Sequence, residues 1–155
     1  MTHFLEALTG DVVVADVIDR HVGRTGTDDA LGVPPGEVVV RRWAVLTGRT
    51  TGIRYCCAES TYLPDRLPAA VCARLAETDH PIGRVLAGQG LRLDRQPMAP
   101  ADPAGTVPPF VDGFSSQIVW SRIYRLLVDG QPAFVIREWF LQPVLSALRH
   151  PDPGP

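Results

Sequence analysis

A glutamate in an otherwise apolar row is the first residue of this sequence that could do chemistry. Glu138 lies within residues 120–142, where two runs of aromatic and β-branched residues flank an Asp-Gly dipeptide. This pattern predicts a β-hairpin, because Asp-Gly tolerates the positive φ of a tight turn. On the second arm Glu138 would share a face with Ile136 and Phe140, where an unpaired charge is costly. We therefore expect Glu138 to have either a partner or a catalytic role.

The length of the turn decides whether an arginine faces this glutamate. A two-residue loop at Asp129-Gly130 would place Arg122 opposite Arg137, whereas a three-residue loop with a glycine bulge would place it opposite Glu138. We expect the second register, because it avoids a like-charge pair. The pair could then be a structural ion pair at a sheet edge, or Arg122 could orient Glu138 or contact a substrate.

Two other stretches could hold an anion. In the predicted strand 37–46, Arg42 falls among apolar residues of one face and is a second candidate for a buried charge. In residues 80–86 a proline opens a short apolar helix, and the N–H groups at its start, those of Ile82 and Gly83, have no partners within the helix. They would point outward with the positive end of the helix dipole, as an anion site or simply toward water.

The composition excludes several classes of function. The chain has 155 residues, 45% of them hydrophobic, which suits one globular domain. A net charge of −2, with arginines scattered along the chain, argues against nucleic-acid binding. The apolar runs are too short to span a membrane, and the first ten residues do not resemble a secretory signal. We therefore expect a cytoplasmic protein with no membrane or nucleic-acid partner.

The types of reactive side chain narrow the chemistry further. All 15 basic residues other than histidine are arginines, so lysine Schiff bases, pyridoxal sites and phosphate-loop lysines are excluded. Adjacent Cys56 and Cys57, with Cys72, suit reduced thiols better than disulfides or a metal knuckle. Cys57 could be a nucleophile, but no neighbouring base would lower its pKa. The histidines are far apart, and we expect no metal and no cofactor. They are His3, His21, His80 and His150.

The order of elements predicts an α+β fold: an antiparallel sheet of about six strands, with helices on one face enclosing a small-ligand pocket. The predicted strands before the hairpin are residues 11–18, 37–46, 53–63 and 91–96. The predicted helices are residues 2–8, 67–78, 81–86 and 143–148. Residues 19–36 read as a loop, and residues 97–113, with five prolines, as a lid over the pocket or a surface excursion. We expect one domain, residues 1–149, followed by a disordered tail, residues 150–155.

The ordered set of motifs resembles the chorismate lyase family, which includes 4-hydroxybenzoate synthases and relatives in specialised metabolism. The matching stretches are Arg42 in RWAVLTG, the AES tripeptide that ends the third predicted strand, PIGRVL from Pro81, Ser121-Arg122, and Glu138 in EWFLQP. The resemblance covers roughly residues 1–142. It implies an antiparallel sheet with an enclosed aromatic-acid pocket, no metal or organic cofactor, and cleavage of chorismate into a hydroxybenzoate and pyruvate.

The resemblance also implies roles for individual residues. Arg42 matches the arginine that pairs with the ligand carboxylate, Ile82 the residue whose backbone N–H joins it, and Glu138 the essential glutamate. A planar guanidinium binds a carboxylate through two parallel hydrogen bonds. The elimination takes a proton from the ring carbon bearing the hydroxyl and delivers one to the departing enolpyruvate. A carboxyl group in an apolar pocket could serve either transfer.

Two departures from the family leave other functions open. Members usually carry a segment ahead of the position of Met1 that forms one wall and a flap, and they are shorter at residues 97–113. We therefore expect a more open pocket, which admits water and weakens electrostatic contacts. One alternative is elimination, dehydration or isomerisation of another carboxylate or carrier-bound intermediate, with a homodimer or carrier-protein contact left open. The other is a ligand sensor without catalysis.

Overall fold

The fold is a single six-stranded antiparallel sheet with helices packed mainly on one side. The computed structural model describes residues 1–27, 30–77, 79–99 and 109–149, and in this part of the chain the sheet order is β1-β2-β3-β6-β5-β4. The strands are β1 Val13–Arg24, β2 Val38–Gly48, β3 Arg54–Tyr62, β4 Leu93–Met98, β5 Ile118–Val128 and β6 Gln131–Leu141. The α+β antiparallel fold expected from the sequence is therefore confirmed.

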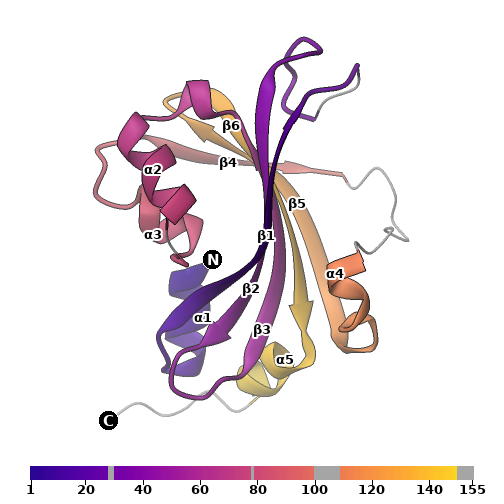
Figure 1. Cartoon of the computed structure of the whole chain (residues 1–155). Coiled ribbons are helices and arrows are strands. Elements are labelled where there is room, and N and C mark those ends of the chain that lie inside the picture. The colour runs from indigo at the N-terminus through magenta and orange to yellow at the C-terminus, as the bar shows by residue number, and fades with distance from the viewer. Residues whose placement is uncertain (28–29, 78, 100–108, 150–155) are drawn as a thin grey trace.

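Two pairs of helices cover one face of this sheet (Figure 1). Helices α2 (Ala69–Glu77) and α3 (Ile82–Leu86) pack on one end of the face, and α1 (Thr2–Thr9) and α5 (Gln142–Arg149) on the other. The short 3-10 turns are Pro64–Arg66 and Ser115–Gln117. None of the helices in the described ranges is long and apolar enough to cross a bilayer. The pattern-based helices are thus present, with ends shifted by one or two residues.

The β5–β6 hairpin has the register that places Arg122 opposite Glu138, as expected. The turn itself differs from the expectation. Val128 pairs with Gln131, so the loop has two residues, and both Asp129 (φ 51) and Gly130 (φ 84) adopt positive φ. The extra residue lies further along, where Leu126 pairs with Phe134 while Leu127 pairs with Pro132. A bulge on β6, beside a proline that cannot donate a ladder hydrogen bond, therefore sets the register.

The first strand is longer than its apolar run. We expected a strand over residues 11–18 and a loop over 19–36, but β1 continues to Arg24, after a register shift between Val17 and Asp19. Its second half is exposed along most of its length and pairs with the first half of β2. The polar composition that suggested a loop is tolerated because this is an edge strand with water on both faces.

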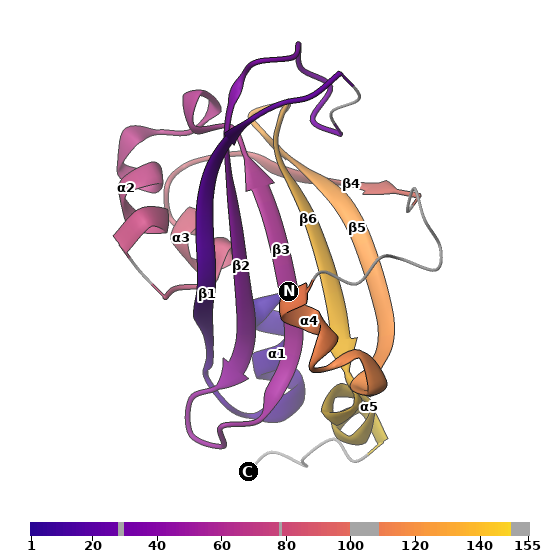
Figure 2. The same cartoon turned by 45° about the vertical axis from the view of Figure 1, so that its right-hand side comes forward.

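Residues 97–113 also differ from the prediction. Pro97 and Met98 belong to β4, which is compatible with proline because β4 is the other edge strand. At the far end of the segment, α4 (Pro109–Asp112) packs on the face opposite to the other helices, where Val111 joins a cluster with Trp139 (Figure 2). This end is therefore not a lid over the helix-covered face. The middle of the segment and the predicted tail at 150–155 lie outside the described residues.

The helix-covered face is divided into two apolar clusters. One gathers around Phe134 and Tyr62 under α2 and α3. The other gathers around Leu5 and Phe140 under α1 and α5. Arg42 and Glu138 are also buried on this face. These two charged residues line one pocket together with members of both clusters, among them Leu46 and Leu86.

Candidate functional site

A cavity occupies the stretch between the two cores. Its floor includes three small side chains, Ala44 of β2 and Ala58 and Ser60 of β3. Ala44 pairs with Ala58, and Ser60 pairs with Arg42 of β2. The cavity has a volume of about 70 Å³, counted as the space open to the centres of water molecules. One water needs only about 10–15 Å³ on this measure, so the hollow holds more than a single solvent molecule. Small side chains in the middle of the sheet thus leave space for more than one water molecule.

Arg42 brings a buried positive charge into this cavity. Its side chain is only 3% exposed, and its Nη2 donates to the backbone oxygen of His80 at 2.9 Å. Burial lowers the pKa of the guanidinium, which means that the surroundings disfavour its charge. Among the described residues no carboxylate pairs with Arg42, and its buried Nε has no hydrogen-bond partner. A buried charge with an unused donor has the chemistry to bind an anion.

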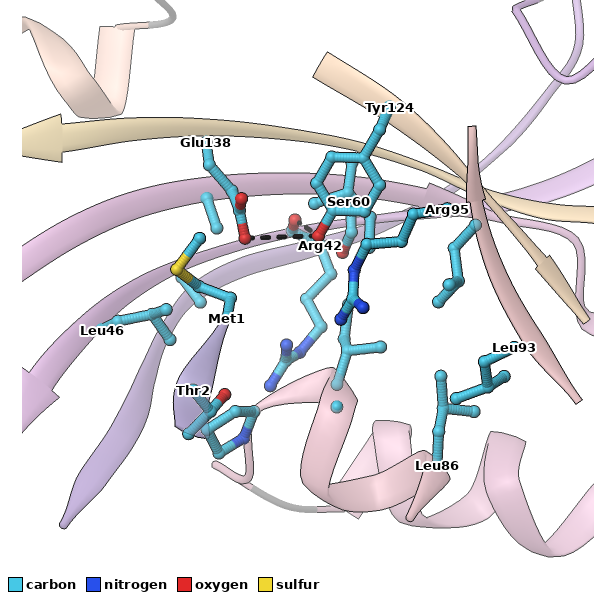
Figure 3. A pocket seen from close by; sticks show the side chains of 17 residues that line it. Met1, Thr2, Arg42, Leu46, Ser60, Leu86, Leu93, Arg95, Tyr124 and Glu138 are labelled. Carbon is cyan, nitrogen blue, oxygen red and sulfur yellow. Dashed lines mark hydrogen bonds between the residues drawn. The ribbon is translucent and has the colours of Figure 1, made fainter. Parts of the chain in front are cut away.

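Glu138 faces the same cavity from β6 and is held by two neighbours on β5. Its Oε2 accepts a hydrogen bond from Nε of Arg122 at 2.5 Å. Its Oε1 accepts one from the phenol of Tyr124 at 3.3 Å (Figure 3). Glu138 is 3% exposed. Burial, followed by the negative charge of Glu138, raises the pKa of Tyr124 well above its usual value. The phenol therefore stays protonated and donates to the carboxylate.

The start of α3 closes the cavity on the helix side. Pro81, Ile82 and Gly83 line it, so the residues whose backbone N–H groups are expected to meet an anion belong to the cavity wall. The helix is anchored to α1, because the guanidinium of Arg84 pairs with the carboxylate of Glu6. In Figure 3 the side chain of Arg42 reaches from the sheet toward this wall. Arg42, Ile82, Gly83 and Glu138 thus share one hollow, with Arg122 beside it.

Several lining residues were missed by the sequence analysis. Ser60, the last residue of the AES tripeptide, lies inside β3, is buried, and lines the cavity. Tyr124 and Arg95 also line it, and the guanidinium of Arg95 lies 5.9 Å from the ring centre of Tyr124. The alternation of β5 could have identified Tyr124, which shares the face of Arg122. No sequence pattern identified Arg95, because β4 is an exposed edge strand, where charged residues are common.

Other reactive groups lie elsewhere. Cys57 points into the cluster on the opposite face, and burial raises its pKa to about 11, so the thiol is protonated and is not a nucleophile of this cavity. Cys56, next to it, lies on the cavity side but is fully buried in the apolar core. Glu59 pairs with Arg41 on the opposite face. In the described part of the chain no cluster of residues is suited to a metal ion.

Comparison with known proteins gives two kinds of relative. The chain is 27% identical to the chorismate pyruvate-lyase of Mycobacterium tuberculosis over 161 residues, which cover 99% of this chain and 80% of that protein. It is 27% identical to the chorismate pyruvate-lyase of Mycobacterium leprae over 155 residues, which cover 94% of this chain and 71% of that protein. No protein-family model matches the sequence.

Solved structures with a similar fold include regulatory proteins. The effector domain of PhnF from Mycobacterium smegmatis superposes with a TM-score of 0.55 at 17% identity, covering 92% of this chain and 88% of that domain. A GntR-family transcriptional regulator from Bacillus cereus gives a TM-score of 0.51 at 12% identity, covering 84% of this chain and 92% of the other. The chain therefore resembles chorismate pyruvate-lyases in sequence over nearly its whole length, and it shares its antiparallel α+β fold with these regulators.

Proposed function

We propose that this protein is a chorismate lyase-like enzyme that eliminates pyruvate from chorismate to give a hydroxybenzoate. The observation that carries the proposal is a buried guanidinium, Arg42, which lacks a carboxylate partner among the described residues and faces the same cavity as the carboxylate of Glu138. The sequence similarity to chorismate pyruvate-lyases supports the same reaction.

In this proposal the two ends of the site have different roles. Arg42 binds the ring carboxylate of the substrate with the Nε that has no protein partner, and the N–H groups of Ile82 and Gly83 add donors from the other wall. Arg122 and Tyr124 fix the orientation of Glu138. The substrate is thereby held with its acid group at one end of the cavity and its reacting carbon toward Glu138.

The elimination needs two proton movements and no oxidant or reductant. Glu138 removes the proton from the ring carbon that bears the hydroxyl, and the released electron pair forms a ring double bond while the ether bond to enolpyruvate breaks. The enolpyruvate takes up a proton at its methylene carbon and becomes pyruvate. Because the ring becomes aromatic, positioning and charge stabilisation supply what the protein must add.

The direct test is incubation of the purified protein with chorismate. Pyruvate is measured with lactate dehydrogenase and NADH, and the aromatic product is identified by chromatography against 3- and 4-hydroxybenzoate. The expected result is one pyruvate for each hydroxybenzoate, at a rate above that of chorismate alone. If chorismate remains unchanged while the protein is folded, it is not the substrate.

A ligand sensor is the second candidate, and the regulators that share the fold favour it. A sensor would use the same cavity to bind a small carboxylate and would return it unaltered. Calorimetry followed by product analysis separates the two functions, because an enzyme consumes the chorismate that a sensor releases. An enzyme acting on a different carboxylate or on a carrier-bound intermediate would bind 4-hydroxybenzoate through Arg42 without cleaving chorismate.

A further inference from the structure

A second hollow, which we call the outer groove, lies beside the cavity on the same face of the sheet. Its volume is about 550 Å³ on the same measure, against about 70 Å³ for the cavity. Three large exposed apolar side chains line it: Phe4 at 50%, Trp120 at 56% and Leu148 at 49% exposure. Single apolar residues at a surface are ordinary, but several around one groove indicate a binding surface.

The outer groove continues the cavity along the β5–β6 hairpin. The pair Arg122–Glu138 is followed on the same face by the next pair, Trp120–Phe140, whose rings stack at 4.8 Å between centres. Glu138 lines the cavity, and Arg122 and Trp120 line the groove. Met1 and Arg95 line both hollows. The two spaces therefore share a wall made by Met1, Arg95 and the ion pair.

The charges of the outer groove lie at its inner end. Arg122 and Arg95 carry its two charged side chains, and the other side chains of the lining are apolar. Glu138 pairs with Arg122, and the guanidinium of Arg95 faces the ring of Tyr124. A complementary occupant is anionic toward the cavity and apolar toward the far end of the groove.

We propose that the site accepts a carboxylic acid with an extended apolar substituent, whose acid group lies in the cavity and whose substituent lies along the outer groove. This inference rests on the carboxylate site at Arg42 that belongs to the proposed function. The cavity is too small for a ring that also carries a long chain, so such a chain must leave it. The neighbouring groove offers apolar side chains that would otherwise contact water.

The test is calorimetry of the full chain with three probes of increasing length: 4-hydroxybenzoate, 4-butoxybenzoate and 4-octyloxybenzoate. A methylene group that becomes fully buried strengthens binding about fourfold, so the octyloxy acid is expected to bind at least about tenfold more tightly than 4-hydroxybenzoate. One molecule should bind per chain, in competition with 4-hydroxybenzoate. Leu148→Ser should remove much of the gain. Ile18→Ser, which changes a similarly exposed apolar residue on β1, should leave the series unchanged.

The outcomes separate this inference from the proposed function. Arg42-dependent binding of 4-hydroxybenzoate with no gain from the longer chains would overturn the extended substrate and leave the lyase proposal standing. Binding of the octyloxy acid that is independent of Arg42, or not displaced by 4-hydroxybenzoate, would show a separate site and also overturn it. A dimer that Leu148→Ser dissociates would assign the groove to a second copy of the chain. Failure of all three acids to bind would remove both proposals.

Discussion

Two arginine–glutamate pairs lie on opposite faces of the sheet, and they differ in distance, exposure and surroundings. On the helix-covered face, Nε of Arg122 lies 2.5 Å from Glu138, whose side chain is 4% exposed. On the opposite face, Nε of Arg41 lies 3.5 Å from Glu59, and the two side chains are 48% and 23% exposed. An exposed pair is screened by water and contributes little, whereas a buried carboxylate depends on its partners.

The surroundings of the two pairs differ as much as their burial. Beside Glu138 lie a cavity and a third charge, Arg42, which has no carboxylate partner among the described residues. Glu59 lies on the far face and does not line the cavity. The comparison predicts that matched substitutions will affect ligand chemistry on one face and leave it intact on the other.

The largest effect is expected from Glu138→Gln. Loss of the group that moves the proton should lower pyruvate formation by about a hundredfold or more, while the amide keeps the shape of the side chain. Glu59→Gln, the matched change on the opposite face, should alter the rate by less than about twofold. The coupled pyruvate assay measures both. Equal rates for the two variants would mean that the buried pair is structural.

Arg42→Gln should weaken binding of 4-hydroxybenzoate by about tenfold to a hundredfold, because hydrogen bonds to a charged group contribute about 1.5–3 kcal/mol. Arg41→Gln is the neighbouring control and should bind as the wild type does. Calorimetry gives both affinities.

The protein with Arg42→Met should unfold at the same temperature as the wild type or at a higher one, because burial disfavours the charged guanidinium that the substitution removes. A large loss of thermal stability would instead identify Arg42 as a structural residue.

Filling the floor of the cavity should weaken binding of the acid. Ala58→Val adds two methyl groups to the floor, and we expect about tenfold weaker binding of 4-hydroxybenzoate with little change in stability. The control is Thr61→Val on the same strand, outside the cavity lining. If Ala58→Val binds the acid unchanged, the ligand does not use this hollow.

The smallest effect is expected from Tyr124→Phe. The phenol donates a rather long hydrogen bond of 3.3 Å to Glu138, so its removal should lower the rate about fivefold or less. Tyr55→Phe, in the apolar core under α1, should have no effect on the rate. A loss as large as that of Glu138→Gln would make Tyr124 a proton donor in its own right.

The sequence predicted the parts of the site whose residue types conflict with their surroundings. Arg42 and Glu138 were identifiable because a charge among apolar residues of a strand needs a reason, and the preference against facing arginines gave the register of Arg122. The cause of that register was not predictable. The register is set by a bulge at the proline end of β6 and not by the turn.

The parts that were missed depend on contacts between distant segments. Ser60 contributes to the cavity by being small, and its size is informative only when the neighbouring lining residues Ala44 and Ala58 are known. Arg95 reaches the site from an edge strand, where exposed charges are ordinary. The helical end of residues 97–113 lies on the opposite face because Val111 packs near Trp139 there. No local sequence pattern predicts this contact.

The central claim is that Arg42 and Glu138 act on one ligand in one cavity. A crystal structure of the protein soaked with 4-hydroxybenzoate tests it most directly. The account predicts the carboxylate within hydrogen-bonding distance of the Arg42 guanidinium and the N–H of Ile82, with the ring extending toward Glu138. An acid bound only in the outer groove, or a cavity closed by the side chains of its own floor, would contradict it.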